Sequence, residues 1–353
     1  MKQTYLSTQT FWRVTAALLI CIALAFGVMP LDPLTVGGGL MVLATAPFPV
    51  TAQLSAVAIA YRNPKLIADD VLPRVPVPDQ SFKYLSYPKG TFFTVPDTKV
   101  GRKSAPGQVE MSATESTDST VDHALDDAVP NADIQAAESQ PNLPNPLMKS
   151  TEFVTDLLEL AREKRTADLV FAAANYAAGN KSTLSGTSQW SHTSSDPITA
   201  IMDALDAMIV RANVLVIGRA AFTKLSMHAK ICKAIFGNNT DAGIVQRQQL
   251  AALFELDEVL VGEGWINTAK KGQAATMVRV WGKHAVLAYR NKNADTQRGT
   301  TFGLTAQWGG RIAGSQYDKN IGMRGGEIVR VGESVKELLA ANDLAYMFED
   351  AVA

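Results

Sequence analysis

The sequence predicts an α+β protein, and three observations support this fold class. A long segment with helical spacing of apolar residues follows residue 150, strands and helices alternate between residues 196 and 272, and the C-terminal part reads as strands joined by glycine-containing turns. Alternation of strands with helices is typical of a compact α/β unit, whereas successive strands indicate a separate sheet. The chain has 353 residues, which is enough for more than one packed subdomain.

The composition excludes several classes of function. The 33 basic and 34 acidic residues give a formal net charge of -1, so no overall positive field marks the chain as a nucleic-acid binder. Cys21 and Cys232 are its two cysteines, and they form no CxxC motif. A disulfide framework or a zinc cluster is therefore not expected, and a reducing compartment is the natural setting.

Residues 1–51 are predicted to form an apolar N-terminal extension. Residues 14–29 carry no charge, and this run of 16 residues is closed by a proline. A transmembrane helix needs ~20 apolar residues, so the run is short for a membrane span. A secretory signal is an alternative, although the tripeptide ATA at 44–46 is followed by proline and is a poor cleavage site. An apolar arm packed against protein, or an extension from a misassigned start codon, stays open, and we expect no membrane insertion.

The segment that follows, from residue 52 to 77, is predicted to combine a short apolar stretch, a turn and an extended exit. A short apolar segment leads to a polar turn at Asn63-Pro64. Prolines at positions 73, 76 and 78 then favour extended backbone at and before each site. Aromatic and branched residues between 80 and 100 predict strand structure, interrupted by a turn at residues 88–90.

Charge is distributed unevenly over residues 80–140, where a basic half precedes an acidic half. The acidic half has no Lys or Arg between residues 109 and 138 and is poor in large apolar residues, so alone it cannot offset its ordering entropy. A disordered linker is one interpretation. We favour a two-stranded excursion that becomes ordered by lying on another subunit. Its candidate inter-subunit contacts are Lys83, Lys89, Lys99, Arg102 and Lys103 in the basic half and Glu110, Glu115, Asp118, Asp122 and Asp126 in the acidic half.

Residues 141–195 are predicted to form a long helix followed by a loop. Ser150 is assigned as the N-cap, and a helix from there to residue 178 is about 40 Å long. Phe153, Leu157 and Ala161 recur at helical spacing and predict the buried core stripe of this helix. The charged run at 162–165 is assigned to its solvated face.

The remaining chain is predicted to form the α/β unit at 196–272 and a β-rich part at 273–353. The expected helices cover residues 198–209, 220–236 and 245–253, and they alternate with strands at 214–217 and 258–261. After residue 277, alternating patterns predict further strands within the runs MVRVWGKHAVLAYR, TTFGLTAQW and GEIVRVGESVKEL. The segment 336–348 fits either a strand or a helix.

The sequence contains no recognisable catalytic or cofactor-binding motif. The glycine run at 37–39 lacks the Lys-Ser/Thr of a phosphate loop, and VGEGWIN lacks the third glycine of a dinucleotide fingerprint. The four histidines are far apart and none belongs to HExxH, while LSGTSQW does not contain the GxSxG elbow. Cys232 reads as a packing residue within a helix. We therefore expect no enzyme activity, no metal and no cofactor.

Five runs follow one another from about residue 52 towards the C-terminus: AIAYRNPKLIADDVLPRVPVPDQSFKYLSYPKG, TEFVTDLLELAREKRTADLVF, KSTLSGTSQW, RQQLAALFELDEVLVGE and RVWGKHAVLAYR. Together they resemble the major capsid proteins of tailed bacteriophages, which have the Hong Kong 97-type fold. The resemblance implies an N-arm at 52–79, an extended β-hairpin E-loop at 80–140, and a peripheral P-domain with a long spine helix and a β-sheet. It places the spine helix and loop at 141–195, an axial α/β A-domain at 196–272, and the β-rich return to the P-domain at 273–353.

The resemblance also implies a function. Subunits of such a protein assemble with one another into hexamers and pentamers of an icosahedral shell, which encloses double-stranded DNA without sequence-specific binding. Portal, scaffold and decoration proteins are further expected partners, and the expected location is the virion capsid after assembly in the host cytoplasm. Two alternatives stay open. One is an encapsulin-like shell around a protein cargo, and the other is an exported or membrane-anchored protein, which rests on the apolar N-terminal run.

Overall fold

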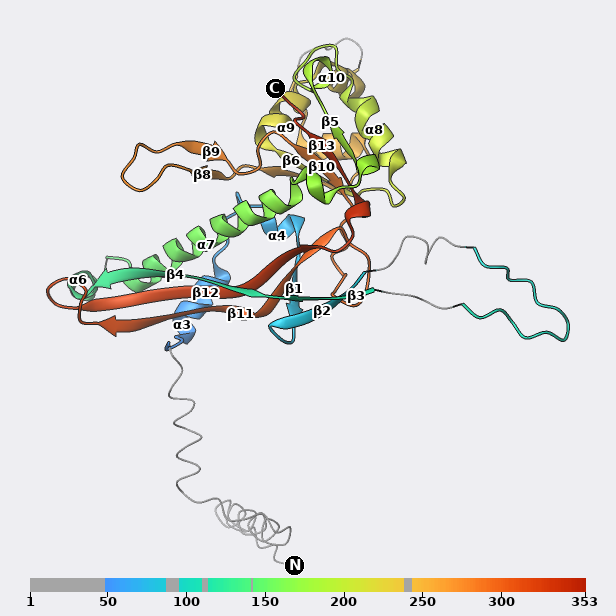
Figure 1. Ribbon diagram of the computed structural model, residues 1–353. Helices are drawn as coiled ribbons and strands as arrows, with labels where there is room; N and C mark the ends of the chain where they lie inside the picture. The colour runs from blue at the N-terminus through green and yellow to red at the C-terminus, as the bar shows by residue number, and fades with distance from the viewer. Residues whose placement is uncertain (1–47, 87–94, 110–113, 141, 238–242) are drawn as a thin grey trace, which may run out of the picture. The chain divides into compact units, whose positions relative to one another are not determined.

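The computed structural model describes residues 48–86, 95–109, 114–140, 142–237 and 243–353 (Figure 1). Within the compact unit Val50–Ala353, strands form two larger sheets and two hairpins, and helices pack on the sheets. The predicted α+β class is confirmed for this unit. No helix among these residues is long and apolar enough to cross a membrane. The predicted N-terminal extension lies almost entirely outside the described residues.

One sheet has four strands in the order β1-β11-β12-β4. Its centre is a long antiparallel hairpin, β11 with β12, in which Val329, Val331 and Val335 lie on one buried face of β12 together with Glu333. A bulge between Trp308 and Ile312 contains Gly309, whose φ of 66° is in the left-handed region that glycine tolerates. The four strands are β1 (Arg74–Val77), β4 (Val121–Pro130), β11 (Gly303–Asp318) and β12 (Gly326–Leu339).

Helices α3 (Ala52–Ala60) and α7 (Pro146–Val170) cover one face of this sheet. In Figure 1, α7 runs along β4 and β12. The helix starts at a different residue from the predicted one. Asn145 is the N-cap, because its side chain accepts a hydrogen bond from the Leu147 backbone N–H at 2.9 Å, and Pro146 occupies the first helical position.

The predicted core stripe of α7 is wrong for the subunit. Phe153, Leu157 and Ala161 lie on the exposed side of the helix. The adjacent stripe, one residue further along, contains Val154 and Leu158, which pack with Leu54 and Ala58 of α3 and with Ala313 and Val331 of the sheet. The charged run was also misplaced, since Arg162 and Glu163 are buried. Their polar partners, described below, lie far away in the sequence, so helical spacing alone could not select the correct stripe.

The second sheet has five strands in the order β5-β13-β10-β6-β7, and helices pack on it to form the α/β unit. Every residue of β6 and β10 is buried, as expected for central strands covered on both faces. The strands are β5 (Lys181–Thr183), β6 (Val214–Gly218), β7 (Glu258–Gly262), β10 (Ala285–Ala288) and β13 (Ala345–Glu349). The helices of this region are α8 (Pro197–Ala207), α9 (Arg219–Ser226), α10 (Ala229–Phe236) and α11 (Arg247–Leu253).

The α/β unit is not the contiguous segment 196–272 that the sequence predicted. Strand β5 comes from the preceding loop, and β10 and β13 come from the C-terminal part. The ambiguous segment 336–348 is divided between the two sheets, because β12 ends at Leu339 and β13 begins at Ala345. The predicted helix at 220–236 is two helices, which are separated at Met227 and His228. Among the described residues, short 3-10 helices complete the connections: η1 (Ala173–Asn175), η2 (Ala178–Asn180), η3 (Gly186–Ser188) and η4 (Asn342–Leu344).

The excursion predicted at 80–140 is shorter than expected. Strand β2 (Ser81–Ser86) pairs with β3 (Thr114–Ser119), but β4 is integrated into the four-stranded sheet of its own subunit. Backbone pairing with β12 thus supplies the stabilisation that the polar sequence of β4 lacks. The described part of the excursion tip is residues 95–109, which form no helix or strand. The remaining elements are α4 (Ala68–Val71), α6 (Asn131–Ser139), β8 (Trp265–Asn267) and β9 (Met277–Arg279).

Candidate functional site

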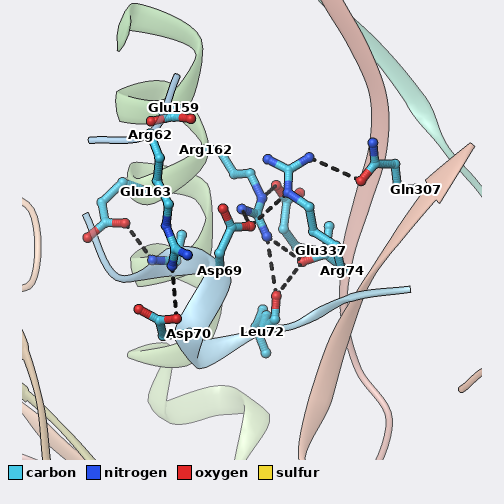
Figure 2. A network of polar contacts seen from close by, with 12 residues as sticks. Arg62, Asp69, Asp70, Leu72, Arg74, Glu159, Arg162, Glu163, Gln307 and Glu337 are labelled. Atoms are coloured by element: carbon cyan, nitrogen blue, oxygen red, sulfur yellow. Dashed lines mark hydrogen bonds and ion pairs between the residues drawn. The ribbon is translucent and has the colours of Figure 1, made fainter. Parts of the chain in front are cut away.

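A cluster of buried charges joins the N-terminal arm to α7 and to the four-stranded sheet. Asp69 of α4 accepts a hydrogen bond from Nε of Arg74 at 2.7 Å and forms an ion pair with Arg162 of α7 (Figure 2). Arg162 also donates to the Leu72 carbonyl at 3.2 Å and to the Thr305 hydroxyl at 2.9 Å. Three segments that are distant in sequence are therefore held by one guanidinium group.

The cluster continues through the sheet. Glu333 of β12 accepts from Arg74 at 2.8 Å and from Arg311 of β11 at 3.2 Å. Arg311 in turn donates to Glu159 of α7 at 3.2 Å and to the Ala58 carbonyl of α3 at 2.9 Å. Charges of opposite sign thus alternate through the interface of helix, arm and sheet, and each buried charge has a partner.

The electrostatics favour the charged forms of the central acids. Burial alone would raise the pKa of Glu333, but Arg74 and Arg311 outweigh it and hold this pKa below its ordinary value. The same balance lowers the pKa of Asp69, where Arg162 and Arg74 outweigh burial. Both carboxylates therefore remain ionised in the folded subunit at neutral pH.

Glu163 of α7 forms a second clamp on the arm. Its carboxylate accepts hydrogen bonds from the backbone N–H groups of Ile67 and Ala68, the latter at 2.7 Å, and from the indole N–H of Trp281. Burial raises the pKa of Glu163 despite these three donors. The clamp fixes the start of α4 against α7, next to the second sheet.

Half of the predicted inter-subunit contacts are engaged within their own subunit. Lys83 pairs with Glu115 across the β2–β3 hairpin at 2.5 Å, and Asp118 pairs with Lys336 at 3.5 Å. Asp122 accepts a hydrogen bond from the Ser334 hydroxyl. Asp126 accepts two bonds from Arg330, each 2.7 Å long. These acids stabilise β3 and β4 locally, which the sequence prediction did not anticipate.

The basic residues of the excursion tip behave differently. Lys99, Arg102 and Lys103 are exposed, like every residue from 95 to 109, and Val95 is 91% exposed. Two hydrogen bonds within this segment are local: Asp97 accepts from the Lys99 backbone N–H at 2.9 Å, and Ser104 N–H donates to the Gly101 carbonyl at 3.0 Å. Lys89 and Glu110 lie outside the described residues.

The part of the chain that the structure describes contains no group of three or more His, Cys, Asp or Glu side chains that could hold a metal ion. The buried histidine, His228, bonds to the Ser195 hydroxyl at 3.1 Å and caps α10. Cys232 is fully buried in the core of the α/β unit, as the sequence indicated.

Sequence reasoning missed the buried charge cluster. One signal was present: Thr151, Thr155, Glu159, Arg162 and Thr166 form a polar stripe at helical spacing along α7, and all five are buried. A stripe that mixes threonine with charged residues is ambiguous, because it fits a solvated face equally well.

Comparisons with known proteins bear on both the sequence and the fold. The family model described as phage major capsid protein E matches residues 172–306. The major capsid protein of Pseudomonas phage JBD67 is 54% identical over 311 residues, which cover 88% of this chain and 100% of that protein. A phage-related protein from Bordetella bronchiseptica RB50 has a similar solved structure, with a TM-score of 0.68 and 26% identity over 86% of this chain and 97% of that one.

The capsid structure of the cyanophage P-SCSP1u is a more distant neighbour. It aligns with a TM-score of 0.51 and 10% identity over 82% of this chain and 89% of its own. At this identity the likeness concerns the fold alone.

Proposed function

This chain belongs to the phage major capsid proteins, and from that premise we propose that its subunit has the Hong Kong 97-type organisation and assembles into hexamers and pentamers of an icosahedral shell. In this proposal the four-stranded sheet with α7 is the P-domain, and the five-stranded sheet with its helices is the A-domain. The segment assigned to the E-loop is reduced from residues 80–140 to the β2–β3 hairpin and the residues between these two strands. Residues 52–79 remain the N-arm, although their contacts with α7 tie them to their own subunit.

The observation that carries the proposal is the exposed tip between β2 and β3. Residues 95–109 are exposed throughout and bond only locally among the described residues. Ordering such a segment costs about 1–2 kcal/mol per residue in backbone entropy, and its own subunit offers little apolar burial in return. Contact with another copy supplies the missing stabilisation, because arms that lie across a neighbour add buried area to each interface.

The buried charge cluster suits a subunit that must keep one shape in many slightly different positions. Shell closure repeats heterologous contacts with small differences of curvature. Replacement of a buried ion pair by apolar residues is often neutral for stability, but removal of one partner is strongly unfavourable. We therefore assign the cluster to fixing the angle between the arm, α7 and the sheet, while the exposed tip adapts to each neighbour.

The genome and the accessory partners follow from the same proposal. The net charge of -1 fits a shell that encloses double-stranded DNA without reading its sequence. Portal, scaffold and decoration proteins are proposed partners, and assembly is proposed to take place in the host cytoplasm.

Negative-stain microscopy of the purified full chain tests the assembly. We expect closed shells of uniform size from the parent chain. Replacing residues 96–108 with a short Gly/Ser linker leaves both strands of the β2–β3 hairpin in place, and should give a folded, soluble subunit that forms no closed shells. A matched control carries the same residues in shuffled order, which preserves length and charge. Normal shells from the linker variant would contradict the role of the tip.

The content of the particles tests whether the shell encloses DNA. Shells purified from phage-infected cells should show the absorbance ratio of nucleic acid with protein. Shells filled with a protein cargo and lacking nucleic acid would favour the encapsulin-like alternative instead.

A further inference from the structure

Strand β4 presents a free edge. It is the outermost strand of the four-stranded sheet, where β12 pairs with it over ten residues, and no strand among the described residues pairs with its other side. Most of β4 is exposed. In such a strand alternate backbone N–H and C=O groups point out of the sheet and can bind an added strand.

The side chains of β4 alternate between two chemistries. Leu125 lies opposite Val331, which is buried beneath α7, so Leu125 belongs to the face that α7 covers, although it remains partly exposed at the edge. Asp122, Ala124 and Asp126 lie on the opposite face. Along the edge, one face therefore offers Leu125 between His123 and Asp127, and the other offers two carboxylates separated by a small residue.

The excursion tip carries the complementary pattern. In an extended segment Lys99, Gly101 and Lys103 point to one face, and Val100 points to the other. The two lysines flank a small residue, with the same spacing as the two aspartates that flank Ala124 in β4. Val100 is exposed, as is the whole segment.

We propose that the excursion tip of one copy adds as an antiparallel strand to the free edge of β4 in a second copy, with Val100 opposite Leu125. This inference rests on the proposed assembly function, and it identifies the edge of β4 as the surface that binds the excursion tip. It places Lys99 opposite Asp126, Gly101 opposite Ala124 and Lys103 opposite Asp122. Charge complementarity fixes such a register more than it adds affinity.

The antiparallel orientation follows from the apolar pair. In a parallel arrangement with Lys99 opposite Asp122, Val100 would face His123, and Arg102 would face Leu125. The antiparallel arrangement instead brings Val100 to Leu125 and Arg102 to His123 on one face, so that the apolar pair forms, and opposite charges meet on the other face.

Docking requires one local adjustment and leaves the existing bonds of Asp126 in place. The turn closed by the Ser104 N–H and the Gly101 carbonyl has to open, and its 3.0 Å bond is replaced by bonds to the β4 edge. Asp126 keeps its two bonds to Arg330, because an ionised carboxylate has further acceptor positions for a lysine.

Disulfide trapping tests the register. Cys21→Ser removes the native cysteine outside the described residues, and Cys232 is buried. Val100→Cys and Leu125→Cys are introduced into separate chains, which are mixed before assembly and then oxidised. Directly opposed strand residues have Cα atoms about 4.5–5.5 Å apart, which suits a disulfide. We expect covalent dimers from the mixture and none from either variant alone.

Two controls make the result specific. Val121→Cys lies four residues along β4 from Leu125, roughly 13 Å away, and should not form a disulfide with Val100→Cys. A chain that carries both Val100→Cys and Leu125→Cys should give a ladder of covalent oligomers. Shells without cross-links in the mixture, equal cross-linking at Val121, or a product that stays within one chain would each overturn the inference.

If the cysteine variants fail to assemble, a charge exchange between Lys103 and Asp122 tests the same register. Lys103→Glu and Asp122→Lys should each reduce the yield of shells, and the double variant should restore it. If the singles assemble normally, or if the folded double variant fails to recover, the acidic edge only protects β4 against unwanted strand addition. Failure of the parent chain to form shells would instead contradict the proposed function itself.

Discussion

Removing the carboxylate charge of Glu333 should destabilise the subunit far more than removing that of Asp126. The two residues form a matched pair. Each lies in the four-stranded sheet, and each accepts two hydrogen bonds from arginine: Glu333 from Arg74 and Arg311, and Asp126 from Arg330. They differ in burial, since the side chain of Glu333 is 1% exposed and that of Asp126 is 40% exposed.

The structure gives the expected magnitudes. Breaking a buried ion pair by removal of one partner costs about 3–5 kcal/mol, because the other charge stays buried without compensation. Arg74 keeps Asp69 at 2.7 Å and Arg311 keeps Glu159 at 3.2 Å, so Glu333→Gln should fall at the lower end, near ~3 kcal/mol. An exposed pair contributes about 0–1 kcal/mol, and Asp126→Asn should stay within that range.

Urea unfolding of the soluble, unassembled subunit measures both changes. The shift per kcal/mol decreases with domain size and is roughly 1.6 °C for a unit as long as Val50–Ala353. Glu333→Gln should therefore also lower the melting temperature by about 5 °C, with little change for Asp126→Asn. Equal effects of the two substitutions would refute the reasoning, since burial is the main difference between them.

Three further predictions concern the same elements. Leu158→Asp should abolish soluble expression, because Leu158 is 4% exposed and an unpaired charge would enter the core. Leu157→Asp should leave the subunit folded, because Leu157 is 39% exposed. Loss of soluble protein in both variants would show that Leu157 is also buried, as the sequence predicted. Stability should fall as pH drops below the ordinary pKa values, near 4, of Asp69 and Glu333, because their folded-state pKa values are lowered and their contribution is lost as pH falls through them. Asp69→Asn should flatten that dependence in urea titrations from pH 3 to 7, and an unchanged slope would exclude Asp69 as a source. Glu163→Ala should accelerate hydrogen exchange at the backbone N–H groups of Ile67 and Ala68, because these groups donate hydrogen bonds to the Glu163 carboxylate. Unchanged protection there would show that other contacts hold the arm.

The α/β unit was predictable because its signals are local. Strand β6 and strand β7 are short apolar runs next to helical patterns, and their burial follows directly from composition. Its extent was not predictable, since β13 joins β10 and β5 through pairings that span the chain. Such long-range pairing leaves no mark in local periodicity.

The burial of α7 illustrates a second limit. Two neighbouring stripes of this helix have apolar residues at helical spacing, one with Phe153 and Leu157 and the other with Val154 and Leu158. The choice between them depends on partners outside the helix: Arg162 pairs with Asp69 of α4, and Glu163 accepts hydrogen bonds from backbone N–H groups at the start of α4. The prediction for the acidic strand β4 was wrong for a related reason. This strand is stabilised by backbone pairing with β12 and not by its own side chains.

The residues at the excursion tip could be identified as basic from sequence, but their acceptor could not. Recognition of the D-x-A-x-D pattern as a surface required the knowledge that β4 is an edge strand and that Asp122 and Asp126 share one face.

A cryo-electron microscopy map of the assembled shell tests the central claim most directly. The account predicts that residues 95–109 of each subunit lie on an adjacent copy, with residues 99–103 forming an extra strand antiparallel to β4 of that copy. A map in which this segment folds back on its own subunit, or in which the free edge of β4 faces solvent throughout the shell, would contradict it.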